Sequence, residues 1–264
     1  MKITEYEIKT NKIKCSVTLA VISDLHSRPY QNVFETVKSI SPDAILLPGD
    51  IVEVATEYME ERNKNGLEFL KMVSTVAPTY YCYGNHEIYN SHAKKGESKS
   101  PDKALSDTYL NAIRAYGVHV INDTYETLTV TDPKENKVSI LLGGIVCGRD
   151  MDPALASPLP DLDLLKQFDL EEGFKILLCH YPHYFDKFIR STSIDLTLSG
   201  HAHGGQWQFF GKGVYAPHQG LFPKFTHGIH EGRHIISRGA ANNVKPIPRF
   251  FNPCEILKVK IIGI

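Results

Sequence analysis

The stretch that decides the fold is Ile194-Asp-Leu-Thr-Leu-Ser-Gly-His-Ala-His-Gly-Gly-Gln206. Its first residues alternate between apolar and polar, which predicts a strand over 194–198 that breaks at Gly200. His201 and His203 follow two residues apart, with two glycines directly behind them. Imidazole is a common ligand for transition metals, and glycines let the backbone come close to a bound ion. The stretch therefore predicts a strand that ends at a metal site.

Four other apolar runs end in the same way. Their apolar residues are nearly continuous, which is typical of strands covered on both faces of a parallel sheet. The polar residues that follow these runs are Asp24 and His26 after 17–23, Asp50 after 43–48, Asn85 and His86 after 79–83, and His180 after 174–178. Ligand sites in open α/β sheets lie outside the carboxyl ends of the strands, so we expect the five strand ends to converge on one point.

Helices are expected between the strands of the first half. Apolar residues at helical spacing predict helices over 31–40, about 57–76 and 103–116. The polar segment 89–101 is expected to be an exposed loop, with a lid over the site as the alternative. The first half is therefore built from strand-helix units.

Strands dominate the second half. Residues 3–8 at the start of the chain alternate like an edge strand. After the helices, the runs 118–121, 125–130 and 138–145 predict the beginning of a second sheet, and 255–262 predicts a final strand. We therefore expect two sheets.

Length and composition are those of an ordinary globular protein. The chain has 264 residues, of which 42% are hydrophobic and 22% charged, and we expect one domain spanning 1–264. Its formal net charge of −1 gives no sign of attraction to nucleic acid or to an anionic membrane. No extended nucleic-acid partner is therefore expected.

The cysteines and the apolar runs indicate the cellular compartment in which the protein is expected. The five cysteines are odd in number and lack Cys-x-x-Cys spacing, which indicates buried thiols in a reducing environment. No apolar run approaches the roughly 20 residues needed to cross a bilayer, and the N-terminal strand has no signal-peptide core. We expect a cytoplasmic protein without an integral membrane segment. The oligomeric state is left open.

Carboxylates, imidazoles and one amide oxygen, with no thiolate, make up the candidate ligand set. Such a set suits Mn²⁺, Fe or Zn²⁺ better than an all-oxygen cage for Ca²⁺ or Mg²⁺. Mn²⁺ is the favoured cation, with Fe and Zn²⁺ as alternatives. Seven ligands, one of them shared, are enough for two divalent ions that keep positions open for water and substrate.

Five short blocks resemble, in order and spacing, the signature motifs of the calcineurin-like metallophosphoesterase superfamily. They are Ser23-Asp-Leu-His26, Gly49-Asp50, Gly84-Asn-His-Glu87, Cys179-His180 and Gly200-His-Ala-His203. The C-terminal third, including Gly204-Gly205-Gln206 and Pro248-Arg249, looks like a bacterial subgroup. Some members of that subgroup act as UDP-2,3-diacylglucosamine pyrophosphatases.

The resemblance implies a fold and a set of roles. The fold is a four-layer α-β-β-α sandwich of the α/β (α+β) class. The implied metal ligands are Asp24, His26 and His203 for one ion, Asn85, His180 and His201 for the other, and Asp50 as the bridge. His86 matches the histidine that contacts the phosphate and can protonate the leaving group.

The leading hypothesis is a dinuclear metal-dependent phosphoesterase that acts on a small-molecule phosphoester or nucleotide-linked substrate. Two cations about 3.5 to 4 Å apart would activate a bridging hydroxide as the nucleophile, with His86 assisting at the phosphate or the leaving group. A non-catalytic interaction scaffold on the same fold is one alternative, which the complete ligand set disfavours. A nuclease is the other, and the neutral charge balance disfavours it. The substrate-binding residues are left open.

Two weaker features remain. Arg149 could bind a phosphate or a sugar acid, but a surface ion pair is the simpler interpretation. The aromatic segment 207–225 favours ordinary core packing, with an apolar wall for a lipid or nucleobase, or a dimer contact, as alternatives. The unassigned histidines are His92, His218, His227, His230 and His234.

Overall fold

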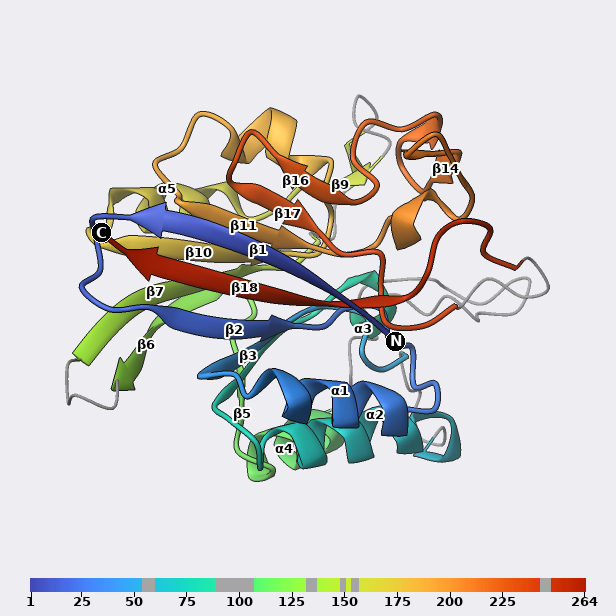
Figure 1. The fold of residues 1–264 in the computed structure, drawn as a ribbon, viewed down its shortest axis with the longest axis horizontal. Helices are drawn as coiled ribbons and strands as arrows, with labels where there is room; N and C mark the ends of the chain where they lie inside the picture. The colour runs from blue at the N-terminus through green and yellow to red at the C-terminus, as the bar shows by residue number, and fades with distance from the viewer. Residues whose placement is uncertain (54–59, 89–106, 132–136, 148–150, 153–156, 243–247) are drawn as a thin grey trace.

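The structure is a computed structural model in which two six-stranded sheets stack face to face (Figure 1). It describes residues 1–53, 60–88, 107–131, 137–147, 151–152, 157–242 and 248–264. The first sheet contains, in spatial order, β1 (Lys2–Thr10), β18 (Glu255–Gly263), β2 (Val17–Val21), β3 (Ala44–Pro48), β4 (Thr79–Cys82) and β5 (Val118–Val120). The second contains β16 (Gly228–His230), β17 (His234–Ile236), β11 (Leu196–Ser199), β10 (Phe174–Cys179), β7 (Lys137–Ile145) and β6 (Thr124–Thr131).

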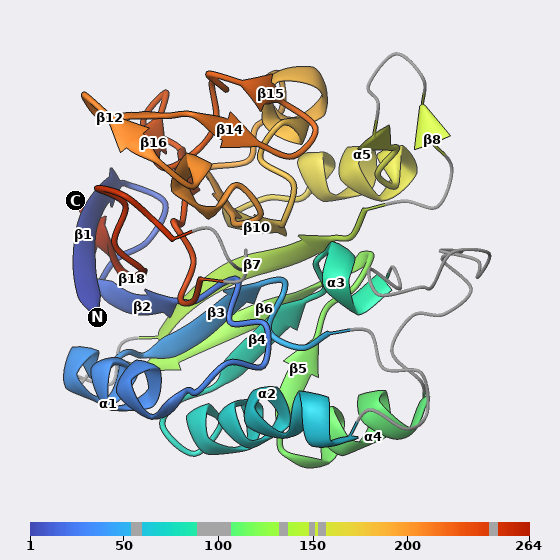
Figure 2. The same ribbon diagram turned by 90° about the vertical axis from the view of Figure 1, so that its right-hand side faces the viewer.

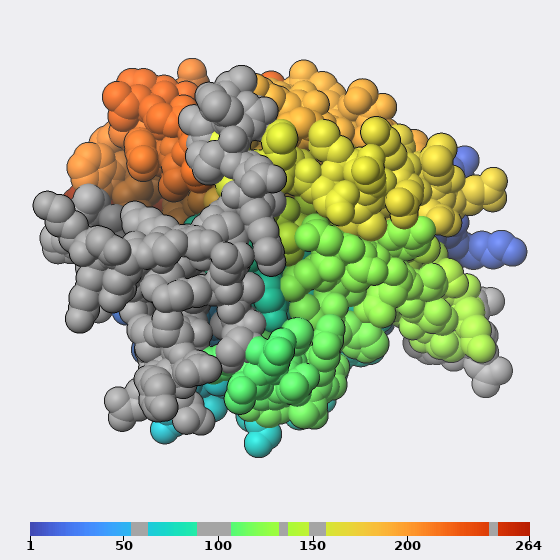
Figure 3. All heavy atoms as spheres, turned by 180° about the vertical axis from the view of Figure 1, so that it is seen from behind, coloured from blue at the N-terminus to red at the C-terminus, as the bar shows by residue number. Residues whose placement is uncertain are grey.

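Helices cover the outer faces of both sheets. Beneath the first sheet lie α1 (Gln31–Ile40), α2 (Glu60–Val73) and α4 (Asp107–Ala115) (Figure 2). On the second sheet lie α5 (Leu162–Leu170) and the π-helical turn η2 (Phe185–Ile189). From the opposite side, α5, in yellow, lies on the surface above the green segment that includes α4 and β6 (Figure 3). The layers run α-β-β-α, which confirms the predicted fold class.

The remaining elements are short. One turn of helix, α3 (Asn85–Ile88), follows β4, and a 3₁₀ turn, η3 (His203–Gly205), follows β11. The two-residue strands are β8 (Met151–Asp152), β9 (Ser157–Pro158), β12 (Gln208–Phe209), β13 (Lys212–Gly213), β14 (Tyr215–Ala216) and β15 (Gly220–Leu221). The last four pair as two hairpins in one lobe above the second sheet (Figure 2).

Alternate residues of each central strand enter two different apolar cores. In β3, Leu46 faces the core between the sheets, whereas Ile45 and Leu47 face the core beneath the helices. In β10, Leu178 lies between the sheets and Leu177 faces the helical layer. Because both faces are covered, the strands are apolar at every position, which is the pattern that the sequence shows.

One expectation about the strands is wrong. The run 118–121 was expected in the second sheet, but β5 pairs in parallel with β4 at the edge of the first sheet. The chain returns there because α4 forms a crossover from β4 to a neighbouring parallel strand. The prediction of an edge strand near the N-terminus is confirmed by β1, which pairs only with β18 in the described sheet.

The preference for core packing of the segment 207–225 is also wrong for most of its aromatic and aliphatic side chains. The exposed fractions are 36% for Trp207, 50% for Phe209, 106% for Phe210, 52% for Tyr215, 70% for Leu221 and 76% for Phe222. Phe225 alone among the seven is buried, at 3%. The hairpins are too short to fold these side chains against the sheet beneath them.

Other expectations have mixed outcomes. Of the five cysteines expected to be buried thiols, Cys82, Cys147 and Cys179 are buried, whereas Cys15 and Cys254 are only partly buried, and all five are free. Among the helices that the structure describes, none is long and apolar enough to cross a membrane. Arg149, His92 and the segment 89–101 lie outside the described residues.

The core between the sheets supplies the first testable prediction. Leu178→Ala removes a fully buried side chain from that core and should lower the free energy of unfolding by about 2–5 kcal/mol. Leu170→Ala is the matched control, because Leu170 is 84% exposed and its truncation should change stability by no more than about 0.5 kcal/mol. Urea unfolding of both variants measures the difference, and equal effects would contradict the assignment of the core.

Candidate metal centre

The five strand ends meet at one edge of the stacked sheets. The backbone remains paired beyond the strands, since the N–H of Asp24 donates to the carbonyl of Gly49 at 3.1 Å and that of His26 to Asp50 at 2.9 Å. In the second sheet the N–H of Gly200 donates to the carbonyl of His180 at 3.2 Å. These bonds hold the loops in register, so the side chains that follow the strands converge.

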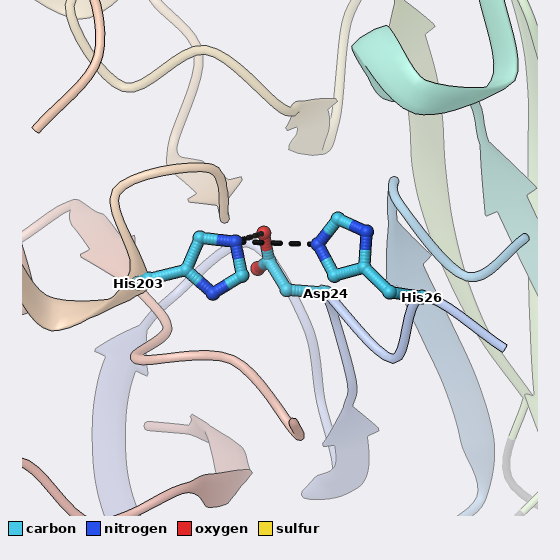
Figure 4. A group of neighbouring side chains, drawn as sticks. All are labelled: Asp24, His26 and His203. Carbon is cyan, nitrogen blue, oxygen red and sulfur yellow. Dashed lines mark hydrogen bonds and ion pairs between the residues drawn. The ribbon is translucent and has the colours of Figure 1, made fainter. Parts of the chain in front are cut away.

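One group of candidate ligands contains Asp24, His26 and His203. Figure 4 shows the carboxylate of Asp24 between the two imidazole rings. The Nε2 atoms of the two histidines lie 3.2 Å apart, and His203 Nε2 lies 3.4 Å from Asp24 Oδ1. The ligand atoms of the three residues all lie within 4.8 Å of one another, close enough to surround a single cation.

A second group contains Asp50, His180 and His201, and all three are buried. His180 Nδ1 donates to the carbonyl oxygen of Pro48 at 2.7 Å, so its Nε2 faces Asp50 Oδ2 at 3.0 Å. A ring fixed by a backbone carbonyl in this way is typical of histidines that bind metals. Asp50 Oδ2 also lies 3.8 Å from His26 Nε2, so this carboxylate stands between the two groups.

Asp50 and His180 of the second group stabilise each other's charged forms. Burial disfavours ionisation of Asp50, but His180, His86 and His26 outweigh it and hold the pKa of Asp50 well below its usual value. Burial also disfavours a charged His180, yet Asp50 raises the pKa of His180 to about 9. For His201, burial and the charge of His180 lower the pKa well below its usual value, so this imidazole is neutral.

Several buried atoms at the site lack the partner that their burial demands. Within the described part of the chain, Asp24 Oδ2, Asn85 Oδ1 and His201 Nε2 accept no hydrogen bond. Buried polar atoms are almost always paired in folded proteins. The two oxygens can only accept, the His201 nitrogen accepts in one of its two tautomers, and a cation is a partner that satisfies acceptors. The donor set therefore fits divalent metal ions.

Asn85 and His86 reach the site from α3. The backbone N–H of His86 donates to Asp50 Oδ1 at 2.9 Å, which places α3 against the second group. Gly84 makes this approach possible, because a Cβ atom there would lie 2.2 Å from Asp50 Oδ1. The structure thus brings together all eight residues that the sequence singled out for metal binding and catalysis.

Glu53 is a site residue that the sequence analysis missed. It is 3% exposed and accepts from His26 Nδ1 at 3.1 Å and from His86 Nδ1 at 2.9 Å. Burial disfavours its charged form, but the hydrogen bonds from both histidines lower the pKa of Glu53 below its usual value. The available signal was a lone acidic residue directly after the buried pair Ile51 and Val52.

Arg249 is the second such residue. Its Nη2 lies 2.9 Å from His203 Nδ1 and also donates to the carbonyl of Ala241 at 2.5 Å, while Nη1 donates to that of Arg238 at 2.6 Å. Arginine is always a donor, so His203 Nδ1 accepts and its Nε2 faces Asp24 and His26. Pro248-Arg249 was noted in the sequence only as part of a resemblance, without a role.

Four of the unassigned histidines fall within the described residues. His218 stacks on His201 with ring centroids 5.4 Å apart. His234 is buried and lies 3.0 Å from Ser199 Oγ. His227 and His230 line a separate hollow with Lys212 and Lys224. None of these four belongs to either candidate group.

Two stacked sheets whose strand ends gather aspartates and histidines define a metal-binding α/β protein. The chain belongs to the calcineurin-like phosphoesterase family, whose model matches residues 17–205. The family uses divalent metal ions, and together with the fold it supports a metal-dependent phosphoester hydrolase.

Individual relatives are distant. The uncharacterized metallophosphoesterase YkuE of Bacillus subtilis is 26% identical over 269 residues, which cover 96% of this chain and 82% of that protein. A transmembrane protein with metallophosphoesterase domain from Danio rerio is 25% identical over 218 residues, or 78% of this chain and 45% of that one. This chain thus spans less than half of the zebrafish protein. The crystal structure of calcineurin-like phosphoesterase YfkN from Bacillus subtilis is 15% identical, with a TM-score of 0.48 and coverage of 86% and 82%.

The contact between Glu53 and His86 gives a prediction for the metal-free protein. Burial lowers the pKa of His86, but Asp50 and Glu53 raise it to about 9. Glu53→Gln should move it by one unit or more toward the ordinary value of about 6.5. A titration followed by the NMR signals of the histidine rings measures this shift. Glu171→Gln, an exposed carboxylate bonded to Tyr125, is the control and should leave His86 unchanged. An unshifted His86 in Glu53→Gln would contradict the contact.

Proposed function

We propose that this chain is a dinuclear metal-dependent phosphoesterase that hydrolyses a small phosphoester or pyrophosphate. The observation that carries the proposal is the convergence of two buried Asp and His groups with acceptor atoms that lack partners. In this proposal the first ion is held by Asp24, His26 and His203, the second by Asn85, His180 and His201, and Asp50 is shared.

The chemistry divides between the ions and the chain. When bound, two divalent cations would activate a water molecule and withdraw charge from a phosphoryl group. His86 is 19% exposed at its side chain, so its ring is open to a substrate while Nδ1 is fixed by Glu53. In the chain without metal ions, burial lowers the pKa of His86 but Asp50 and Glu53 raise it to about 9, and Glu53 stays bonded to Nδ1. A protonated His86 can donate its proton from Nε2 to the oxygen of the leaving group.

Finer parts of the proposal rest on the sequence. Mn²⁺ suits the mixed oxygen and nitrogen ligands, with Fe and Zn²⁺ as alternatives. Resemblance in the C-terminal third favours the subgroup that includes UDP-2,3-diacylglucosamine pyrophosphatases. Buried thiols favour a reducing, cytoplasmic setting. Because both sheets contribute to the site, we treat 1–264 as one catalytic domain.

Metal analysis with an activity assay tests the proposed function. The purified chain should bind about two ions and hydrolyse bis(p-nitrophenyl) phosphate or p-nitrophenyl phosphate when Mn²⁺ is added. His86→Ala should keep the metal and lose about 10²- to 10⁴-fold in kcat. His119→Ala, an exposed histidine of β5, is the matched control. Asp50→Asn should weaken the binding of both metal ions. A protein without metal and without turnover after reconstitution would favour the non-catalytic scaffold instead.

Metal uptake should also be coupled to proton release. His180 has a pKa of about 9, so at pH 7 it holds a proton that a metal at Nε2 must displace. Affinity should therefore rise with pH up to about 9 and level off above it. Calorimetry at pH 7 in two buffers of different ionisation enthalpy should reveal about one released proton for this site. Binding that is independent of buffer and of pH would disprove the assignment of His180.

A further inference from the structure

Eight of the fifteen exposed large apolar side chains in the described part of the chain lie on or beside the lobe above the second sheet. We define the aromatic surface as Trp207, Phe209, Phe210, Tyr215, Leu221, Phe222, Phe250 and Phe251. Phe250 and Phe251 are 49% and 80% exposed. Soluble proteins expose single apolar residues everywhere, but a cluster of this kind marks a contact surface.

The members of the aromatic surface are neighbours in space. The rings of Trp207 and Phe250 lie 6.0 Å apart, and those of Phe209 and Phe251 lie 6.2 Å apart. Tyr215 pairs with Leu221 across the second hairpin. Residues in or next to both hairpins line the same two hollows, so the hairpins lie side by side. The surface is therefore continuous over both hairpins and the segment 250–251.

Three residues of the aromatic surface have a strained backbone. Phe210, Phe222 and Phe251 have φ angles of 50°, 51° and 53°, in the left-handed region. Bulky residues rarely adopt this conformation, where glycine or asparagine would cost less. Each ring projects from a turn at 76% exposure or more, so packing does not repay the strain. A strained backbone that is not offset by packing indicates that these rings contact something other than this chain.

Charge on the same part of the chain is strongly asymmetric. From Leu196 to Cys254 the sequence has six lysines and arginines and one acidic residue, Glu231. The segment therefore carries +5, which leaves −6 on the rest of a chain whose formal net charge is −1. Lys212 lies two residues after Phe210, at the end of the first hairpin. Two of these cations, Lys212 and Lys224, line one hollow together with Phe222, whereas Arg238 pairs with Glu255.

The aromatic surface is also continuous with the candidate metal centre. A cavity of about 350 Å³ is lined by Ala202, His203, Trp207, Tyr215, Pro217 and Leu221, together with three further residues of the lobe. One wall belongs to the metal-binding group through His203, and another belongs to the aromatic surface. A partner bound to this surface would therefore lie close to His203.

We propose that the aromatic surface docks the protein on an anionic lipid bilayer. Phe210, Phe222 and Phe251 insert among the lipid headgroups, and Lys212 and Lys224, which line one hollow with Phe222, face the negative lipid charge. Apolar rings on separate turn tips with flanking cations suit the bilayer interface, where rings enter individually. The inference goes beyond the proposed phosphoesterase activity and does not depend on it.

Vesicle flotation of the full chain tests the proposal. The protein should bind vesicles of phosphatidylcholine that contain phosphatidylglycerol more tightly than vesicles of phosphatidylcholine alone, and added salt should weaken the binding. The triple variant Phe210→Asn, Phe222→Asn and Phe251→Asn should lose at least about tenfold in partitioning. Its melting temperature should stay the same or rise, because asparagine tolerates the left-handed backbone.

Matched variants separate this surface from general effects. Leu170→Asn removes an 84% exposed apolar side chain from α5 and should leave partitioning within about twofold. Lys212→Glu should reduce binding roughly tenfold, whereas Lys166→Glu, the same charge change on α5, should reduce it much less.

Several outcomes would overturn the proposal. One is the absence of binding to anionic vesicles at low salt, and another is undiminished binding by the triple variant. A protein that binds a single-stranded oligonucleotide but no vesicle would assign the surface to base stacking instead. Self-association that the triple variant abolishes, without vesicle binding, would assign it to a second copy of this chain.

Discussion

Burial of ionisable groups at the strand ends is the constraint on which the rest of the structure depends. Asp24, Asp50 and His180 are at most 1% exposed, and an uncompensated buried charge costs several kcal/mol. The side chains have no room to turn toward solvent, because strands that are apolar on both faces hold their backbones between two cores. Acceptor atoms consequently face one another across short distances, and the cost of that arrangement falls when a cation lies between them.

A surrounding layer of hydrogen bonds keeps these groups in place. Glu87 is wholly buried and accepts a bond from the hydroxyl of Tyr81. It also accepts the backbone N–H groups of Asp50, Ile51, Val52 and Gly84 at 2.7–3.1 Å. One carboxylate thus ties the loop after β3 to the loop after β4. Glu53 orients two imidazoles, so each ring presents Nε2 to the site. These hydrogen bonds hold the candidate ligands in a single arrangement, which is the kind of preorganisation on which a catalytic site depends.

Local patterns made much of this predictable from the sequence. Continuous apolar runs identify the buried strands, and polar residues directly after them identify Asp24 and His180 because strand ends share one edge. Glu53 and Arg249 were not predictable as site residues, since their roles depend on contacts between segments far apart in the chain. The placement of β5 failed for the same reason, because a strand pattern does not say which sheet the strand joins.

The aromatic lobe shows a different limit of sequence reasoning. Apolar residues in short strands predict a core, but a hairpin of two-residue strands has too little backbone to turn Phe209 and Phe210 inward. Net charge is misleading in the same way, because the total of −1 averages +5 on the segment 196–254 and −6 on the rest of the chain. The strained backbone at Phe210 and Phe222 adds what composition lacks. A conformation that costs folding energy and brings no packing in return is the observation from which we infer a role for the exposed rings at a surface.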